Sequence, residues 1–382
     1  MIYFVMDLNT ARSNTPIDQQ QNISKDILSE IIELQNKLSS SNSPIELKEE
    51  TMRAIQRLER MAKWGNYSTE FEGVDKYVDW VTRIPWGNLT EDNLNIQNAK
   101  QVLDSTHYGM ETVKNLILDY LAVMQLRKLR GYKEASDGTA KAPVLLFVGL
   151  QGVGKTSIAK SIADSMGRKF ARISLGAVGD VRTLRGVPRH EIDSEPGQVI
   201  KALIRTQSMN PVILIDEIEK ASSNGGLLND VMAALLEVLD PEQNSAFIDH
   251  YIDHPVDLSN VFFICTANNL GGLSAALLDR MEVIRFTSYS DEEKAVIAKS
   301  YILPRVLANI GLTTNHIQIA ESVWPLLIRP VGFDAGIRQL ERNISTLARS
   351  AARKIMGGQP LPIVITPENV KEYVLPDQGP LS

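Results

Sequence analysis

Residues 142–161 read APVLLFVGLQGVGKTSIAKS, and this stretch decides the fold. It begins with an apolar run at 144–148 that has the length and the Val, Leu and Phe content of a buried strand. Residues 149–156 follow and match the pattern G-x-x-x-x-G-K-[ST]. Apolar residues at 158–166 then recur at the spacing of one helix face. A strand, a glycine-rich loop and a helix in this order predict a phosphate-binding loop.

The residues of this loop have separate predicted roles. Glycines leave backbone N–H groups open to an anion, and the helix N-terminus adds a partial positive charge. Lys155 is expected to reach the β- and γ-phosphates of ATP, and Thr156 to hold Mg²⁺ through its hydroxyl. An ordinary glycine-rich turn before a helix is the alternative, which the coincidence of all the parts disfavours. The predicted nucleotide-binding residues here are Gly149, Gly152, Val153, Gly154, Lys155, Thr156 and Ser157.

A second apolar run, at 211–215, ends in Asp216 and Glu217. An acid at the end of a buried strand can hold Mg²⁺ directly or through water. The glutamate beside it can accept a proton from an attacking water molecule. A strand that simply ends in two solvated acids is the alternative, and the upstream loop favours a nucleotide site. We therefore expect Asp216 to contact the nucleotide and, with Thr156, Mg²⁺, and Glu217 to be catalytic.

Composition excludes several classes of function. The 382 residues suggest about two or three domains. A net charge of −6 and a pI near 5.6 give no reason to expect nucleic-acid binding. Cys265 is the single cysteine, so no disulfide can form within the chain. No apolar run approaches the roughly 18–20 residues that span a membrane, and neither end carries a targeting signal.

Alternating strands and helices from 144 to 286 predict an α/β fold, with a parallel sheet covered by helices on both faces. Upstream, apolar spacing predicts helices at 23–38 and 45–62, either as a helical hairpin or as two ordinary bundle helices. Beyond residue 290 the strands are expected to stop, which leaves a small, mostly helical domain. The expected parts are a helical region at 1–104, a nucleotide-binding domain at 105–287 and a helical lid at 288–382.

Several stretches resemble the Lon family of ATP-dependent proteases, which belong to the AAA+ class. They lie at 80–86, 91–94, 107–109, 168–176, 216–220, 234–244 and 277–283, and the resemblance covers about residues 20–376. It implies an AAA+ P-loop fold with a helical linker and lid, and a homo-hexameric ring that hydrolyses ATP with Mg²⁺. Its partners would be unfolded or damaged proteins. Relatives work in bacterial cytoplasm, mitochondria and peroxisomes, and the stretch APVLLFVG favours the peroxisomal ones.

The resemblance assigns four further site residues. Asn268 resembles the sensor that orients the attacking water, and Arg280 the arginine finger that reaches a neighbouring subunit's nucleotide. Arg338 resembles the lid arginine that senses the nucleotide, and Tyr108 is expected near the adenine. The alternatives are a strand-end Asn that caps a turn, a surface ion pair, an exposed helix Arg and a packing Tyr.

The sequence departs from the family pattern at the loop expected to grip polypeptide in the pore. The family carries an aromatic residue followed by an aliphatic one, whereas this chain has Glu191 and Ile192. A carboxylate cannot wedge between substrate side chains as an aromatic ring does. The sequence therefore leaves open whether this loop grips a substrate.

The chain ends at Ser382, where the family's serine–lysine protease domain would begin. We therefore expect ATPase activity but no peptide cleavage from this chain alone. A fragment of a longer protein and a natural motor-only relative both remain open, and the starting Met favours the second. The function expected is a motor that unfolds and translocates proteins; the alternative is a nucleotide-binding relative that regulates full-length subunits.

Overall fold

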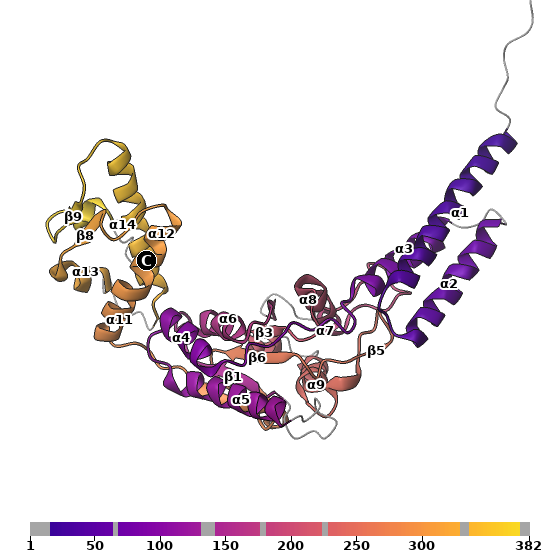
Figure 1. The fold of residues 1–382 in the computed structure, drawn as a ribbon, viewed down its shortest axis with the longest axis horizontal. Coiled ribbons are helices and arrows are strands. Elements are labelled where there is room, and N and C mark those ends of the chain that lie inside the picture. Colours follow the sequence, from indigo (N-terminus) through magenta and orange to yellow (C-terminus); the bar gives the residue numbers. More distant parts are fainter. Residues whose placement is uncertain are drawn as a thin grey trace, which may run out of the picture.

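The computed structural model describes residues 16–63, 68–130, 142–175, 181–223, 228–328 and 336–374. The charges and glycine of residues 128–140 predict a surface loop, and residues 176–197 have no periodicity and predict a long loop. Residues 131–140 and 176–180 of these segments, and Ser382, lie outside the described ranges. Figure 1 shows a helical arm, a central sheet with its helices, and a lid that follows the sheet in the chain.

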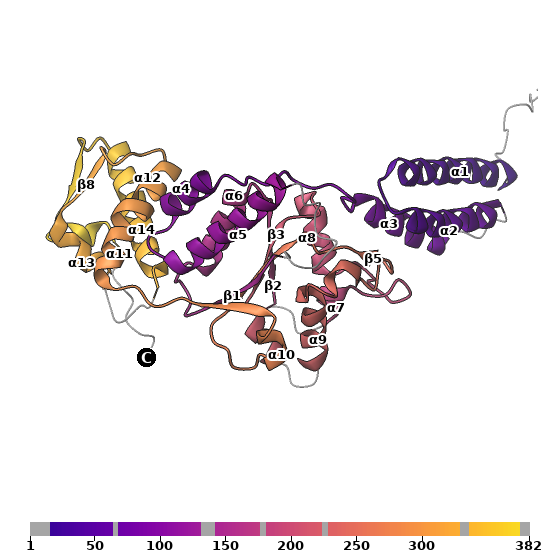
Figure 2. The same cartoon turned by 60° about the horizontal axis from the view of Figure 1, so that its bottom comes forward.

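The arm consists of three helices, α1 (Pro16–Ser40), α2 (Ile45–Lys63) and α3 (Ser68–Arg83). The first two lie side by side, joined by a short turn, and α3 packs against both (Figures 1 and 2). Their apolar positions, among them Leu38 and Ile55, are buried because they recur on one helix face. The two amphipathic helices expected from the sequence are present, and the arm is a small three-helix unit.

Five parallel strands form the central sheet in the order β2-β3-β6-β1-β7. Their bounds are β1 Val144–Val148, β2 Phe170–Ser174, β3 Val212–Asp216, β6 Phe262–Ala267 and β7 Met281–Arg285. Successive residues of β1, β3 and β6 alternate between two buried clusters, one on each face. Burial on both faces explains why these strands read as continuous apolar runs, and the predicted parallel sheet is confirmed.

Helices cover both faces of this sheet. One cluster contains residues of α4, α5 and α6, and the other residues of α8 and α9. The bounds are α4 Ile96–Thr106, α5 Glu111–Leu129, α6 Lys155–Met166, α7 Arg182–Arg185, α8 Gln198–Thr206, α9 Leu228–Leu239 and α10 Ala275–Leu278. The last of these, α10, is a short helix of four residues. Its N-cap is Ser274, whose Oγ accepts from the N–H of Leu277 at 3.3 Å.

The lid has its own buried core. Its helices are α11 Asp291–Ile297, α12 Leu303–Asn309, α13 Trp324–Ile328 and α14 Arg338–Met356, with a π-helical turn, Ala298–Ile302, between the first two. The expectation that strands stop after residue 290 is wrong. Two three-residue strands, β8 (Ile317–Ile319) and β9 (Ile363–Ile365), pair in parallel. Runs this short carry too few residues for an alternating pattern to be recognised.

The predicted division of the chain into three parts, with boundaries at 104/105 and 287/288, stays a prediction. Its first boundary falls inside α4, where Ala99 and Leu103 are buried in the cluster that also contains Ile117 of α5 and Ile158 of α6. A second small ladder, β4 (Phe247–Ile248) with β5 (Pro255–Val256), lies outside the main sheet. In the described ranges no helix combines the length and apolarity needed to cross a membrane.

Candidate nucleotide-binding site

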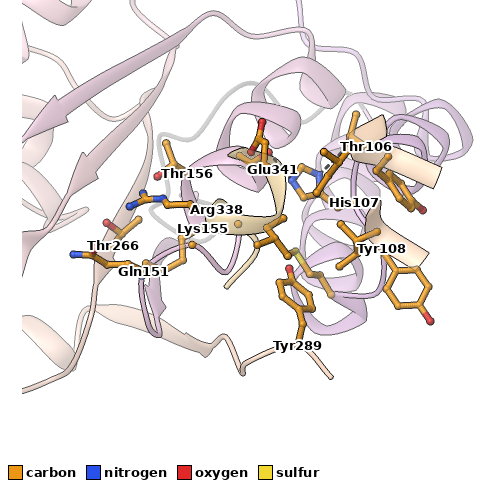
Figure 3. Close-up of a pocket in the computed structure, with 18 of the residues that line it drawn as sticks. Thr106, His107, Tyr108, Gln151, Lys155, Thr156, Thr266, Tyr289, Arg338 and Glu341 are labelled. Carbon is orange, nitrogen blue, oxygen red and sulfur yellow. Dashed lines mark hydrogen bonds between the residues drawn. The ribbon is translucent and has the colours of Figure 1, made fainter. Parts of the chain in front are cut away.

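A cleft lies where the carboxyl ends of β1, β3 and β6 meet the lid, and it collects most of the predicted site residues (Figure 3). Figure 3 shows Lys155, Thr156 and Arg338 at one end and Thr106, His107 and Tyr108 at the other. The α/β side contributes Tyr108, Gly152, Gly154, Lys155, Thr156, Ser157, Asp216, Glu217 and Asn268, and the lid side Tyr289, Tyr301, Arg305, Arg338 and Glu341.

The glycine-rich loop has the backbone geometry that an anion requires. Gly152 and Gly154 adopt φ values of 84° and 93°, in the left-handed region that favours glycine. Backbone bonding into α6 begins with the N–H of Ile158, which donates to Gly154 O at 2.9 Å. The preceding N–H groups therefore have no acceptor one helical turn back, and together with the helix dipole they form a site suited to phosphate.

Lys155 is held across the mouth of this loop. Its Nζ donates to the carbonyl oxygens of Gly149 and, at 3.0 Å, Leu150, and to Oδ1 of Asn268 at 3.3 Å. Burial lowers the pKa of Lys155, and the nearby carboxylates, Glu219 first, oppose that shift. The ammonium group thus lies between the phosphate loop and the end of β6, within reach of an anion on the loop.

The Thr266 hydroxyl joins the Asp216 carboxylate at the end of β3 to the backbone of Glu217. Thr266 Oγ1 donates to Oδ1 of Asp216 and accepts from the N–H of Glu217 at 3.0 Å. Glu217 has φ 61°, an uncommon backbone conformation for a non-glycine residue that is found at functional sites. Lys220 Nζ donates to its Oε2 at 2.8 Å, and Arg172 pairs with Oδ2 of Asp216 at 2.5 Å.

Asn268 connects the lysine to the acidic segment that follows β3. Its Oδ1 accepts from Lys155, and its Nδ2 donates to Oε1 of Glu219 at 2.7 Å. Sequence reasoning placed Asn268 at the site but did not identify Thr266 or Arg172. Thr266 could have been found, because it is the one hydroxyl in the apolar strand 261–267; Arg172 gave no comparable signal.

The lid contacts the phosphate loop directly. The N–H of Ile337 donates to Gly152 O at 3.1 Å, and Arg338 begins α14 at this point. Tyr289 OH donates to Val153 O at 2.9 Å, and burial raises its pKa to about 12. Arg338 is thereby placed at the cleft by a backbone contact. Tyr289 was not predicted.

His107 and Tyr108 line the end of the cleft farther from Lys155. His107 Nε2 lies 2.9 Å from Oγ of Ser157, and its Nδ1 lies 3.0 Å from Oγ1 of Thr106. Burial lowers the pKa of His107 to about 4, with the charges of Lys114 and Arg305 adding to the shift. The ring is therefore neutral near pH 7. Tyr108 is 37% exposed, so its ring is accessible at the edge of the cleft.

Five predicted residues lie outside the cleft lining: Gly149 and Val153 of the phosphate loop, and Arg280, Glu191 and Ile192. Arg280 pairs with the buried Asp240, with Nη2 3.5 Å from Oδ2. Within one chain Arg280 therefore forms an ion pair, which was the alternative to the arginine-finger role. Glu191 Oε2 lies 2.9 Å from Nη1 of Arg182, and Ile192 is 91% exposed. The finger role of Arg280 requires a second subunit and stays a prediction, as do the pore-loop roles.

The cleft fits Mg²⁺ only together with phosphate. Among the described residues, no group of three or more His, Cys, Asp or Glu side chains is placed to hold a metal ion on protein ligands alone. Mg²⁺ in nucleotide sites takes one or two protein ligands, phosphate oxygens and waters. Thr156 and Asp216 both line the cleft and supply the donor types that such a site needs.

Comparison with known families identifies two regions. Residues 145–289 match the ATPase family associated with various cellular activities (AAA), and residues 308–363 match the Lon protease AAA+ ATPase lid domain. The first match together with the parallel sheet confirms the predicted α/β AAA+ fold. The second match covers β8, which the helical expectation had missed.

Curated relatives match most of this chain. Lon protease 2 of Thermus thermophilus is 44% identical over 349 residues, which are 91% of this chain and 43% of that protein. Lon protease of Roseiflexus castenholzii is 45% identical over 88% of this chain and 41% of its own length. The mitochondrial Lon protease homolog of Mus musculus is 41% identical over 84% of this chain and 32% of its own length.

The chain therefore spans less than half of the length of these relatives. They are bacterial and mitochondrial proteins, so they give no support to the expectation of a peroxisomal location.

Proposed function

Because this chain belongs to the Lon family, we propose that it hydrolyses ATP with Mg²⁺ in the cleft between its α/β domain and lid. The observation that carries the proposal is the convergence of separate segments on one cleft. The phosphate loop, the acidic end of β3, the end of β6 and the start of α14 all line it.

Each group has a distinct task. The loop N–H groups and Lys155 bind the phosphates, and Thr156 and Asp216 hold Mg²⁺. When bound, Mg²⁺ withdraws charge from the phosphate oxygens. Glu217 accepts the proton of the attacking water, and Asn268 orients that water. Lys220 positions the Glu217 carboxylate, since its Nζ lies 2.8 Å from Oε2.

The lid and a second subunit complete the proposed cycle. Arg338 enters the cleft from the lid, so a change at the γ-phosphate reaches the lid through it. Arg280, 46% exposed at the side chain and outside the cleft lining, serves the nucleotide of a neighbour in a homo-hexameric ring. The cycle would move the loop that carries Glu191 and Ile192, and so translocate an unfolded or damaged protein. Peptide cleavage would belong to the serine–lysine protease domain of a full-length protein.

The test is Glu217→Gln. We expect this variant to bind a fluorescent ATP analogue like the parent and to lose ATP turnover, because the amide cannot accept the proton. Lys155→Ala should lose binding as well, and it serves as the control for a damaged pocket. Turnover at the parental rate in Glu217→Gln would remove Glu217 from the mechanism. Arg280→Ala, assayed over a range of protein concentrations, tests the ring: parental activity should rise with concentration and the variant's should not.

One observation favours a second candidate, a nucleotide-binding subunit that regulates full-length partners without translocating substrate. Glu191 is paired with Arg182 and carries no ring to insert between substrate side chains. The two candidates separate on unfolding of a tagged protein. If the parent unfolds it, the motor proposal stands. If only Glu191→Tyr does so, the regulatory candidate replaces it.

A further inference from the structure

Arg172 lies on β2, the edge strand of the sheet, and pairs with the carboxylate proposed to hold Mg²⁺. Its backbone is in register with Leu214, whereas Ser174 is the residue in register with Asp216. The Arg172 side chain therefore runs two residues along the strand direction before its Nη2 reaches Oδ2 of Asp216 at 2.5 Å. Such a reach is available to arginine because its side chain is long and flexible.

Both oxygens of the Asp216 carboxylate are engaged by protein groups. Oδ1 accepts from Thr266 and Oδ2 from Arg172. The Asp216 side chain is 8% exposed, so little water screens the pair from that side, whereas the Arg172 side chain is 52% exposed. A cation at Oδ2 must therefore share that oxygen with a guanidinium or displace it. Arginine stays protonated at every relevant pH, so pH does not relieve this competition.

The surroundings of Arg172 favour its position on Asp216. A shallow cleft beside β2 is lined by Lys169, Arg172 and Arg205 with uncharged neighbours, and no acid is among its lining residues. Like charges repel, so a guanidinium turned into that cleft would lie near two other cations. Asp216 is the acid with which Arg172 pairs, and the exposed side of Arg172 leaves room for it to move when a stronger cation binds.

We infer that Arg172 is a built-in counter-ion that competes with Mg²⁺ for Asp216 and sets the Mg²⁺ concentration at which the nucleotide site fills. The inference rests on the proposed function, since it requires the cleft to bind ATP with Mg²⁺. Arg172 is a positioning residue: it acts on the metal only through Asp216 and contacts no substrate. Its consequence is a site that needs a higher concentration of free Mg²⁺ to fill than it would need without Arg172.

The experiment titrates free Mg²⁺ against the binding of a fluorescent ATP analogue to the full chain and reads the midpoint of the Mg²⁺-dependent gain in affinity. We expect Arg172→Gln to lower this midpoint about three- to fivefold, the effect of removing one half-exposed ion pair. Arg205→Gln removes an equal charge from the same cleft and should stay within about twofold of the parent, as should Arg172→Lys, which keeps the charge.

An unchanged or higher midpoint in Arg172→Gln would overturn the inference, because Arg172 would then only brace the edge of the sheet. An equal shift in Arg205→Gln would also overturn it, since general charge would explain the effect. If Arg172→Gln does not fold, Arg172→Met, of similar length, replaces it and the same midpoints decide. Failure of the proposed function looks different: the parent itself would bind no nucleotide at any Mg²⁺ concentration.

Discussion

Gly336 packs directly against the phosphate loop, and Gly336→Ala tests whether this contact controls nucleotide binding. A Cβ at Gly336 would lie 2.7 Å from the carbonyl carbon of Gly152 and 2.8 Å from Gln151 O. Favourable carbon–carbon contacts begin at about 3.5 Å, so the lid and the loop would have to separate by about 0.8 Å. Both neighbours are backbone atoms of the loop and cannot turn aside as a side chain would.

The cost of that separation has two parts. The hydrogen bond from Ile337 N–H to Gly152 O, 3.1 Å long, would stretch beyond bonding range and lose about 1 kcal/mol. Overpacking at a tight contact adds about 1 to 3 kcal/mol. Together they oppose the closed arrangement by about 2 to 4 kcal/mol, and about 1.4 kcal/mol corresponds to a tenfold change. We therefore expect ATP to bind at least about tenfold more weakly, because Arg338 moves away with the lid.

The assay is equilibrium binding of a fluorescent ATP analogue, with thermal unfolding measured in parallel. Gly357→Ala is the matched control, because Gly357 ends the same helix at φ −80° and its added Cβ would meet nothing closer than 3.3 Å. The control should bind like the parent. If Gly336→Ala binds ATP within about twofold of the parent while folded, the contact between lid and loop does not contribute to binding, and the reasoning is refuted.

Three further predictions concern protonation and the arm. Burial lowers the pKa of His107 to about 4, so its ring is neutral at physiological pH. ATP affinity measured at a series of pH values from about 6 to 8 should therefore show no transition from this histidine. A transition with a midpoint near 6.5 would contradict this. Burial raises the pKa of Asp249 to about 6, so as the pH falls the native state binds this proton at a higher pH than the unfolded chain does. Protonated Asp249 therefore adds stability to the native state, and up to about 3 kcal/mol of it is lost as the pH rises through about 6. The unfolding free energy of Asp249→Asn, measured in urea, should lack this pH-dependent change. Parallel pH profiles for parent and variant would refute the prediction. Gly73 lies inside α3 with open space at its Cβ position, so Gly73→Ala should raise the unfolding free energy by about 0.5 to 1 kcal/mol in a thermal melt, and a lower melting temperature would count against it.

The central sheet could be predicted because burial on both faces leaves continuous apolar runs separated by helical periodicity. The short elements could not. β8 and β9 are three residues each and lie more than forty residues apart, so neither has a local pattern. Their pairing comes from the lid core, in which Ile317, Ile363 and Ile365 are buried with residues of α14. Short strands held by distant partners follow tertiary packing rather than local propensity.

The residues of the candidate nucleotide site also separate into those that a local motif predicts and those that it does not. Lys155, Thr156 and Asp216 lie in contiguous motifs, where the spacing itself carries the chemistry. Arg172 and Tyr289 reach the site from other segments and have no motif around them. Arg172 is found only from the register of β2 against β3. Contacts that depend on which strands are neighbours cannot be deduced from spacing along one segment.

The loop that carries Glu191 is also braced by segments far away in sequence, and this bears on the proposed motor. The Arg189 guanidinium carbon lies 4.3 Å from the ring centroid of Tyr77 on α3, and Nη2 lies 3.5 Å from Oε1 of Glu50 on α2. Lys76 Nζ on α3 donates to Ser194 O at 2.6 Å. A loop can transmit force to a polypeptide only if its base resists the load. If the loop pulls substrate as proposed, the arm would supply part of that resistance, and the arm and this loop would act as one mechanical unit.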